Sequence, residues 1–272
     1  MTSQVEKGTA FRVLHESDRA FIIPNPWDVG TARLLQSLGF KALATTSAGF
    51  AYSIGKPDGV VDRETMLAHA ADLVAATDLP VSADLENGYG NDPTDVAETV
   101  RLAATAGLAG CSIEDVAARR QQAPYELALA AERVRAAAEA AHSLKFPFML
   151  TARAENYVIG RPDLKDTIAR LQAFQEAGAD VLFAPGLKTR EDIATVVKSV
   201  DLPVNVVMGL QGVQLSVAEL STIGVKRISV GSALSRAALG AFLRAAREMQ
   251  TRGTFAFAED AVKYSEINEM FA

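Results

Sequence analysis

The sequence predicts a (β/α)8 barrel, and three observations predict it. Eight short apolar runs recur along residues 20–250, and amphipathic, alanine-rich stretches follow them. The interiors of the runs are almost continuously apolar, as is typical of parallel strands that helices cover on the outside. Eight strand–helix units in a chain of 272 residues match the usual size of this barrel. A doubly wound sheet is the alternative, but no Gly-x-Gly-x-x-Gly motif follows the first run to support it.

The predicted strands are short and evenly distributed. They span residues 21–26, 41–47, 79–86, 109–115, 146–155, 179–186, 203–208 and 227–232. Four of the intervening helices carry boundary signals, namely an acidic or hydroxyl residue at the start and, for three of them, a glycine just beyond the end. These helices are 28–38, 92–106, with Asp92 before Pro93 at its start, 163–177 and 189–200.

Composition excludes several classes of protein. The net charge of −6 argues against a nucleic-acid or anionic-membrane partner, because both need a basic patch. No apolar run approaches the roughly 18 residues of a membrane span. The N-terminus is polar and mixed in charge, unlike a secretory signal, and one cysteine suits a reducing cytosol. We therefore expect a cytoplasmic protein with a single domain over residues 1–272.

The C-terminal tail, residues 253–272, remains after the eighth helix. Several of its apolar residues, including Phe255, Tyr264 and Phe271, recur at roughly helical spacing. Such a tail must bury its apolar side chains on its own barrel or on a neighbouring subunit. We favour the second arrangement, a homo-oligomer.

Two carboxylates mark the end of the third strand. Asp84 and Glu86 are two residues apart, so alternation along a strand would point both side chains the same way. Two like charges side by side are unfavourable unless a positive charge lies between them, and a hard divalent cation would supply it. The alternative is that both acids are solvated at the edge of a loop.

Other polar residues fall at the ends of neighbouring strands, where barrels of this kind place their active sites. They are Asn25, Thr45, Thr46, Ser47, Asp58, Glu114, Asp115, Arg153, Glu155, Asn205 and Ser232. Carboxylates at Asp58, Asp84, Glu86 and Glu114, with no histidine, predict magnesium or manganese rather than zinc. Arg153 suits a substrate carboxylate, and a salt bridge to Glu155 or Glu114 is its other role.

Absences narrow the chemistry further. His15, His69 and His142 all fall in helical stretches, and we expect surface or helix-end positions for them. No lysine ends a strand, which argues against a Schiff-base aldolase. Cys111 has the strand parity opposite to Glu114 and should face the helices as a small core residue.

These motifs together resemble the phosphoenolpyruvate mutase/isocitrate lyase superfamily over nearly the whole chain. The matching stretches are Pro24-Asn25-Pro26-Trp27-Asp28, Thr45-Thr46-Ser47-Ala48-Gly49, Gly55-Lys56-Pro57-Asp58, Asp84-Leu85-Glu86-Asn87-Gly88-Tyr89-Gly90, Ser112-Ile113-Glu114-Asp115 and Thr151-Ala152-Arg153. The resemblance implies a barrel whose last helix is exchanged between subunits of a dimer or tetramer. It implies Mg²⁺ held by Asp84, with Asp58, Glu86 and Glu114 helping through water. The backbone of Thr46 and Ser47, with Arg153, would hold a substrate carboxylate or phosphonate.

Residues 116–124 depart from the lyases of this superfamily. The corresponding loop of isocitrate and methylisocitrate lyases carries a Lys-Lys/Arg-Cys-Gly-His motif, and here it has no cysteine, glycine or histidine. The acid that those lyases place after strand six is replaced by Ala184 and Pro185. The chain resembles members without the cysteine, which include oxaloacetate decarboxylases and phosphonopyruvate hydrolases. Arg119 and Arg120 could close over a distal carboxylate; the alternative is two solvated arginines.

The function expected from this resemblance is that of a Mg²⁺-dependent lyase. It would break a C–C bond in a small 2-oxo or 2-hydroxy di- or tricarboxylate through a metal-stabilised enolate. Glu114 and Asp58 would assist Arg153 in catalysis, and Asn205 would bind substrate. The alternatives are C–P chemistry on phosphonopyruvate, a non-catalytic barrel that binds a carboxylate metabolite, and a phosphate-binding isomerase barrel that uses Gly231 and Ser232.

Overall fold

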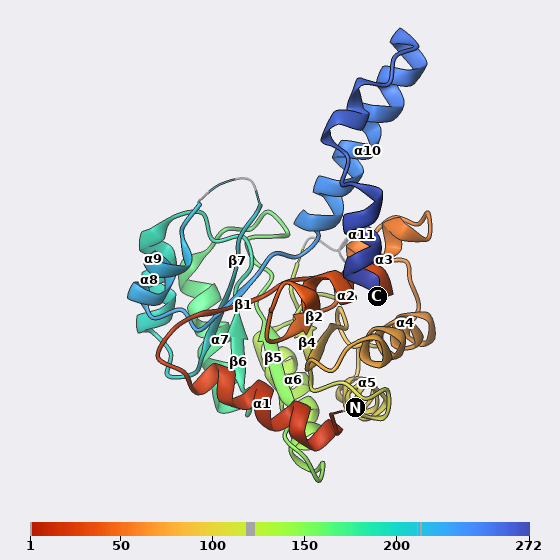
Figure 1. The fold of residues 1–272 in the computed structure, drawn as a ribbon. Coiled ribbons are helices and arrows are strands. Elements are labelled where there is room, and N and C mark those ends of the chain that lie inside the picture. Colours follow the sequence, from red (N-terminus) through yellow and green to blue (C-terminus); the bar gives the residue numbers. More distant parts are fainter. Residues whose placement is uncertain (1, 118–122, 211, 213) are drawn as a thin grey trace.

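The computed structural model describes residues 2–117, 123–210, 212 and 214–272, and it confirms the predicted barrel (Figure 1). Its eight strands are all parallel and form one sheet in the order β1-β8-β7-β6-β5-β4-β3-β2. They are β1 (Phe21–Ile23), β2 (Leu43–Ala44), β3 (Val81–Asp84), β4 (Gly110–Glu114), β5 (Met149–Arg153), β6 (Val181–Phe183), β7 (Val204–Val207) and β8 (Arg227–Ser229). The Ala44 amide donates to the Pro24 carbonyl at 3.0 Å, which brings β2 beside β1 and nearly closes the barrel.

Helices alternate with the strands and cover the outside of the sheet (Figure 1). They are α1 (Gln4–Glu16), α2 (Val29–Ser37), α3 (Ser47–Ser53), α4 (Arg63–Ala76), α5 (Pro93–Thr105), α6 (Leu127–His142), α7 (Leu164–Glu176), α8 (Arg190–Lys198), α9 (Val217–Ile223), α10 (Ala233–Arg252), the 3-10 helix η1 (Ala256–Asp260) and α11 (Tyr264–Phe271). The four helices expected from boundary signals are present as α2, α5, α7 and α8. Asp28, Asp163 and Thr189 cap three of them as predicted, each accepting from a backbone N–H in the first turn.

The strand interiors are buried on both faces, which explains their continuous apolar runs. On the helix-facing side, Leu150, Ile113 and Cys111 belong to the main core, and Cys111 is fully buried as predicted. On the inner side the barrel is polar near the carboxyl ends of the strands, where the predicted site residues lie. Helix α1 lies across the other end, where the strands begin, and Phe11 packs there against Gly110.

His15 and His142 lie in the last turns of their helices as expected, whereas His69 is buried in mid-helix, contrary to the expectation of a surface or helix-end position. His69 lies in the middle of α4, is 8% exposed and stacks on Phe50 with ring centroids 3.7 Å apart. His15 is at the end of α1 but only 2% exposed, because α1 packs across the end of the barrel where the strands begin. Its Nδ1 lies 2.8 Å from the Phe11 carbonyl. His142, at the end of α6, is half exposed and lies beside Asp180.

The burial of His15 predicts a loss of stability in acid. Burial, and then the charge of Arg227, lowers the pKa of His15 from 6.5 to about 3. The unfolded chain therefore binds a proton that the folded chain does not, and stability falls as the pH drops from 6.5 toward 3. Between pH 7 and pH 4.5 this group removes about 2–3 kcal/mol. Urea unfolding at pH 7 and pH 4.5 measures this effect. The free energy of unfolding of His15→Gln should fall by about 2–3 kcal/mol less than that of the wild type between these two pH values. Equal losses in the two proteins would contradict a neutral, buried His15.

The C-terminal segment leaves the barrel. Helix α10 projects away from the strands, and η1 and α11 return along it to reach α2 (Figure 1). Phe271 at the end of α11 lies against Gly30 of α2, so part of the apolar tail packs on its own chain, although Phe271 stays 42% exposed. Other apolar side chains stay exposed, among them Phe242 at 66% and Tyr264 at 85%. Within the described ranges, no helix has both the length and the apolar character needed to cross a bilayer.

Candidate active site

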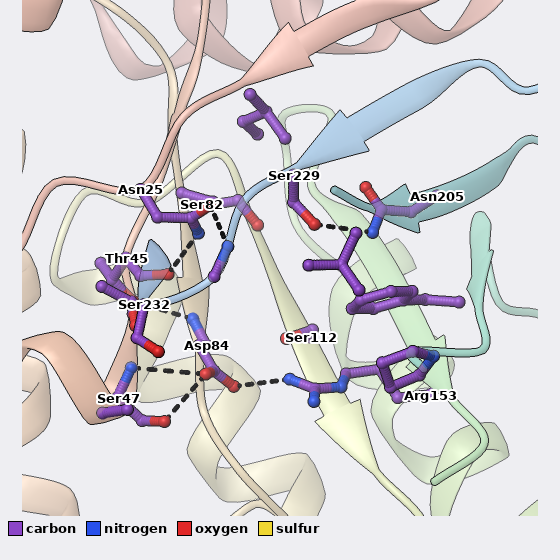
Figure 2. A pocket seen from close by; sticks show the side chains of 18 of the residues that line it. Asn25, Thr45, Ser47, Ser82, Asp84, Ser112, Arg153, Asn205, Ser229 and Ser232 are labelled. Carbon is purple, nitrogen blue, oxygen red and sulfur yellow. Dashed lines mark hydrogen bonds and ion pairs between the residues drawn. The ribbon is translucent and has the colours of Figure 1, made fainter. Parts of the chain in front are cut away.

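A cavity of about 180 Å³ opens at the carboxyl ends of the strands, and every strand or the residue after it contributes to its wall. Pockets for drug-sized ligands measure about 300–1,000 Å³, so this one suits a smaller molecule. Figure 2 shows polar side chains from opposite sides of the barrel pointing into the same space. Those labelled include Asn25, Ser47, Ser82, Asp84, Ser112, Arg153, Asn205 and Ser229.

Asp84, the last residue of β3, lies at the centre of the acidic side of this cavity. Its Oδ2 accepts from the Ser47 hydroxyl at 2.9 Å and lies 3.3 Å from the Ser47 amide. The same hydroxyl lies 3.2 Å from Asp58 Oδ1, which places Asp58 beside Asp84 although 26 positions separate them. Thr46 caps α3 by accepting from the Gly49 amide, and so fixes the start of the helix that carries Ser47.

Arg153, the last residue of β5, binds three carboxylates. Its NH1 lies 3.0 Å from Asp84 Oδ1, its NH2 2.9 Å from Glu114 Oε1 and its Nε 2.8 Å from Glu155 Oε1. The strand register accounts for part of this, because Glu114 and Arg153 are directly paired between β4 and β5. Of the two roles considered for Arg153, the salt bridges are therefore formed. Its planar fork still has N–H groups that these three contacts do not use.

Glu86 reaches the same cluster by a different route from the one predicted. Strand β3 ends at Asp84, and Glu86 and Tyr89 both have positive φ, at 49° and 60°. Alternation along a strand therefore does not orient Glu86, and this part of the prediction was wrong. A tight turn does so instead, in which the Glu86 carbonyl accepts from the Glu114 amide at 2.7 Å. Positive φ is costly for a tyrosine and is typical of functional sites.

Two acids of this cluster, Glu86 and Glu114, have raised pKa values. Burial, and then the charge of Asp84, raises the pKa of Glu86 to about 7. Burial also raises the pKa of Glu114 well above its ordinary value, although Arg153 opposes the shift. Glu86 Oε1 is buried and has no hydrogen-bond partner among the described residues. A positive charge beside Glu86 would stabilise its ionised form.

The donor set fits a hard divalent cation. In the part of the chain that the structure describes, no three His, Cys, Asp or Glu side chains converge closely enough to hold an ion directly. Mg²⁺ commonly binds through one or two carboxylates and keeps several water ligands. Asp84 at the cavity wall, with Asp58, Glu86 and Glu114 near it, matches that mode. The orphaned oxygen of Glu86 would find a partner in such a water shell.

The remaining predicted site residues do not all lie in the cavity wall. Asn205 lies in the cavity wall, 1% exposed, and its Nδ2 donates to Ser229 Oγ at 3.0 Å. Asp115 turns away from the cavity, since it accepts from the Glu155 amide and pairs with Arg170 at 3.2 Å. Arg119 and Arg120 lie outside the described residues.

Sequence reasoning missed part of the cavity wall, namely Ser82, Ser112, Arg227 and Ser229. Strand parity could have found the first two, because Ser82 and Ser112 lie two positions before Asp84 and Glu114 and share their inward face. Arg227 is the first residue of β8, whereas barrel active sites are expected where strands end, so its position in the sequence carried no signal.

The fold and the site define a class of protein. It is a (β/α)8 barrel with a polar cavity at the carboxyl ends of its strands, where Arg153 binds three carboxylates, and barrel enzymes place their active sites at this end. The chain belongs to the phosphoenolpyruvate phosphomutase family, whose model matches residues 11–250, and so to the phosphoenolpyruvate mutase/isocitrate lyase superfamily. It is an enzyme of this lyase and mutase type. A solved structure from Burkholderia cenocepacia J2315 is 60% identical, with a TM-score of 0.96 over 99% of this chain and 96% of that one.

Curated relatives point the same way. An uncharacterized protein of Mycobacterium tuberculosis is 34% identical over 88% of each chain. An oxaloacetate decarboxylase of Paraburkholderia xenovorans is 30% identical over 75% of this chain and 69% of its own. A 2-methylisocitrate lyase of Halalkalibacterium halodurans is 29% identical over 74% of this chain and 67% of its own. The resemblance read from the motifs is confirmed.

Proposed function

We propose that this protein is a Mg²⁺-dependent lyase that breaks a C–C bond in a small 2-oxo dicarboxylate. The observation that carries the proposal is the meeting of Asp84, Arg153 and Ser47 in the wall of one small cavity. Glu114 pairs with Arg153, and Asp58 lies beside the Ser47 hydroxyl. Relatives named for oxaloacetate decarboxylation and methylisocitrate cleavage support the reaction type. The family membership supports it independently.

In the proposed reaction, Arg153 orients the substrate. Its unused N–H groups donate to the substrate carboxylate next to C2, while Asp84, Glu114 and Glu155 hold the guanidinium in place. Thr46 and Ser47 would bind the same carboxylate from the start of α3. The ion, when bound near Asp84, supplies Lewis-acid stabilisation for the negative charge that C–C cleavage leaves on the substrate. The buried walls strengthen these interactions by excluding water.

The wall beside β6 favours a 2-oxo acid over a 2-hydroxy acid. Cleavage of a 2-hydroxy acid needs a base to take the hydroxyl proton, whereas loss of CO2 from a 2-oxo acid does not. Phe183 and Pro185 form this wall, and neither side chain can accept a proton. Decarboxylation of a substrate such as oxaloacetate therefore requires no proton acceptor on this wall, whereas a base for methylisocitrate cleavage would have to come from elsewhere in the site, and we propose decarboxylation first.

Pyruvate release tests the proposal. Oxaloacetate, 2-methylisocitrate and phosphonopyruvate are each assayed with Mg²⁺, with Mn²⁺ and with EDTA, against enzyme-free blanks because metal ions decarboxylate oxaloacetate unaided. We expect metal-dependent turnover, fastest with oxaloacetate. Faster turnover of phosphonopyruvate would indicate C–P chemistry. No turnover of any of the three, together with tight binding of oxalate, would indicate a carboxylate-binding barrel.

We also propose that the protein works in the cytoplasm as a homo-oligomer, a dimer or tetramer, assembled through its C-terminal helices. The exposed apolar side chains of α10, such as Phe242 at 66% and Leu243 at 45%, support this. Trp27, Ala238 and Leu239 line an apolar hollow beside them. Apolar patches of this kind on a projecting helix are typical of interfaces.

Phe242→Asp is expected to convert the oligomer to smaller species. A charge in the centre of an apolar interface is strongly unfavourable. Light scattering coupled to gel filtration would measure the mass. Val13→Asp is the matched control, since Val13 is an exposed apolar residue of α1, at 54%, far from α10. An unchanged mass for Phe242→Asp, or a monomeric wild type, would contradict assembly through α10.

A further inference from the structure

Arg227 is a buried cation on the floor of the cavity, and the proposed reaction does not use it. It is the first residue of β8, is 5% exposed and contributes to the cavity wall. Its Nε donates to Asn205 Oδ1 at 2.9 Å and its NH2 donates to Thr151 Oγ1 at 2.9 Å. Its NH1 lies 3.4 Å from His15 Nε2 at the end of α1. The guanidinium therefore spans the barrel from β5 to β7.

None of these partners carries a negative charge. Asn205 and Thr151 are neutral. His15 is neutral as well, because its Nδ1 bonds to the Phe11 carbonyl and its Nε2 is left to accept from Arg227. Burial and Arg153 lower the pKa of Arg227 to about 9, which still leaves it charged at neutral pH. Among the described residues, no carboxylate forms a salt bridge with Arg227, whereas Arg153 binds three.

The cavity is therefore electrically polarised. Its Asp84 side holds carboxylates, and its Asn205 side holds, among the described residues, a cation with only neutral partners. Figure 2 shows Asn205 and Ser229 together, across the cavity from Ser47 and Asp84. A buried charge without a counter-ion is costly, so an anion that enters this side would be bound strongly.

Arg227 also determines which way the Asn205 amide points. Because Arg227 donates to Oδ1, the NH2 group must face the other way, where it donates to Ser229 Oγ at 3.0 Å. An amide NH2 has two hydrogens, so one is not used by Ser229, and Asn205 lines the cavity. Asn205 thus offers a hydrogen-bond donor, next to the positive charge of Arg227, to a ligand bound at this side of the cavity.

We propose that Arg227 is a positioning residue that makes the floor at Asn205 the receptor for the second carboxylate of a dianionic substrate. This deepens the proposed function and rests on it: Thr46, Ser47 and Arg153 hold the first carboxylate, and Asn205, aligned and charged through Arg227, holds the second. The substrate class is then a short dicarboxylate, and a monocarboxylate of the same backbone is bound weakly.

Malate and lactate test this directly, because they share the 2-hydroxy acid end and differ by the distal carboxylate. Titration calorimetry in Mg²⁺ compares their Kd values for the wild type, Arg227→Gln and Arg227→Lys. We expect the wild type to prefer malate by tenfold or more. Arg227→Gln should lower that preference by about 10- to 100-fold, with lactate changed by no more than about threefold. Arg227→Lys should recover part of it. An unchanged ratio, or equal weakening of both ligands, would overturn the proposal.

If Arg227→Gln does not fold, the stability of a second variant, Asn205→Asp, tests whether the charge of Arg227 is unneutralised. Asn205→Asp places a carboxylate 2.9 Å from the unneutralised Arg227. We expect a melting temperature higher by about 2–4 °C or more, with malate binding lost. Asn25→Asp is the matched control in the same cavity: Asn25 donates to the Thr45 carbonyl at 2.9 Å, so this change should lower the melting temperature. An Asn205→Asp protein no more stable than the wild type would refute the unneutralised charge.

The two proposals fail separately. If the preference for malate depends on Arg227 but no oxo acid is turned over, the role of Arg227 is supported and the proposed lyase activity is refuted. If oxo acids are turned over but the preference for malate does not depend on Arg227, the lyase activity is supported and the role of Arg227 is refuted. A wild type that binds neither malate nor lactate would contradict both.

Discussion

Asp84→Asn is expected to abolish metal-dependent turnover while the barrel stays folded. Asp84 contacts Ser47 and Arg153 and stands beside Asp58, so its charge is the one most directly available to an ion in the cavity. Loss of a group that supports a catalytic ion costs at least 10- to 100-fold even when that group does not touch the ion. For a direct ligand we expect about 10³-fold or more in kcat/KM. Steady-state kinetics across Mg²⁺ concentrations, with calorimetric Mg²⁺ binding, measure both effects.

Asp18→Asn is the control for Asp84→Asn. Asp18 is an exposed acid in the segment between α1 and β1, so it changes the net charge equally without touching the cavity. Its turnover and Mg²⁺ affinity should match those of the wild type. If Asp84→Asn kept wild-type turnover and the same dependence on Mg²⁺, the assignment of the metal site would be wrong.

Arg153→Gln is expected to lose both activity and stability, and Mg²⁺ should restore part of the stability. Removing the guanidinium leaves Asp84, Glu114 and Glu155 without their shared cation. Breaking a buried ion pair from one side costs about 3–5 kcal/mol because an uncompensated charge remains. Urea unfolding with Mg²⁺ and with EDTA measures this loss. Kinetics should show no saturation by substrate, since the carboxylate has lost its partner.

Arg170→Gln provides a matched comparison for Arg153→Gln. Arg170 is also buried and pairs with two acids, Asp115 and Asp166, but it lies outside the cavity wall. We expect a comparable loss of stability, no recovery on adding Mg²⁺ and a much smaller effect on KM. If the two variants behaved alike in all three measurements, Arg153 would have only a structural role.

Much of the fold could be read from the sequence because parallel strands buried on both faces produce unbroken apolar runs. The eight runs correspond to β1–β8, and Asp28, Asp163 and Thr189 cap the helices at which they were expected. The acids of the site were found for a related reason. A barrel brings the carboxyl ends of all its strands to one face, so Asp84, Glu114 and Arg153 had to be neighbours.

The errors have equally specific causes. Glu86 was oriented by strand alternation, but the strand ends at Asp84 and a turn with positive φ carries Glu86 instead. His69 was expected at the surface or at a helix end, but it is buried in mid-helix, because a helical position alone does not say which face is covered. Arg227 was overlooked because it begins its strand, and nothing local reveals that the cavity extends down to it.

The sequence by itself therefore determined the barrel, the family and the identity of the acids, because strand periodicity and the βα order are local properties of the chain. Tertiary structure decided which charges are neutralised. Arg153 is bound by three carboxylates, from β3, from β4 and from Glu155 two residues after β5, whereas Arg227 has neutral partners among the described residues. Electrostatic pairing depends on distances between strands far apart in the chain, and those distances exist only once the barrel has closed.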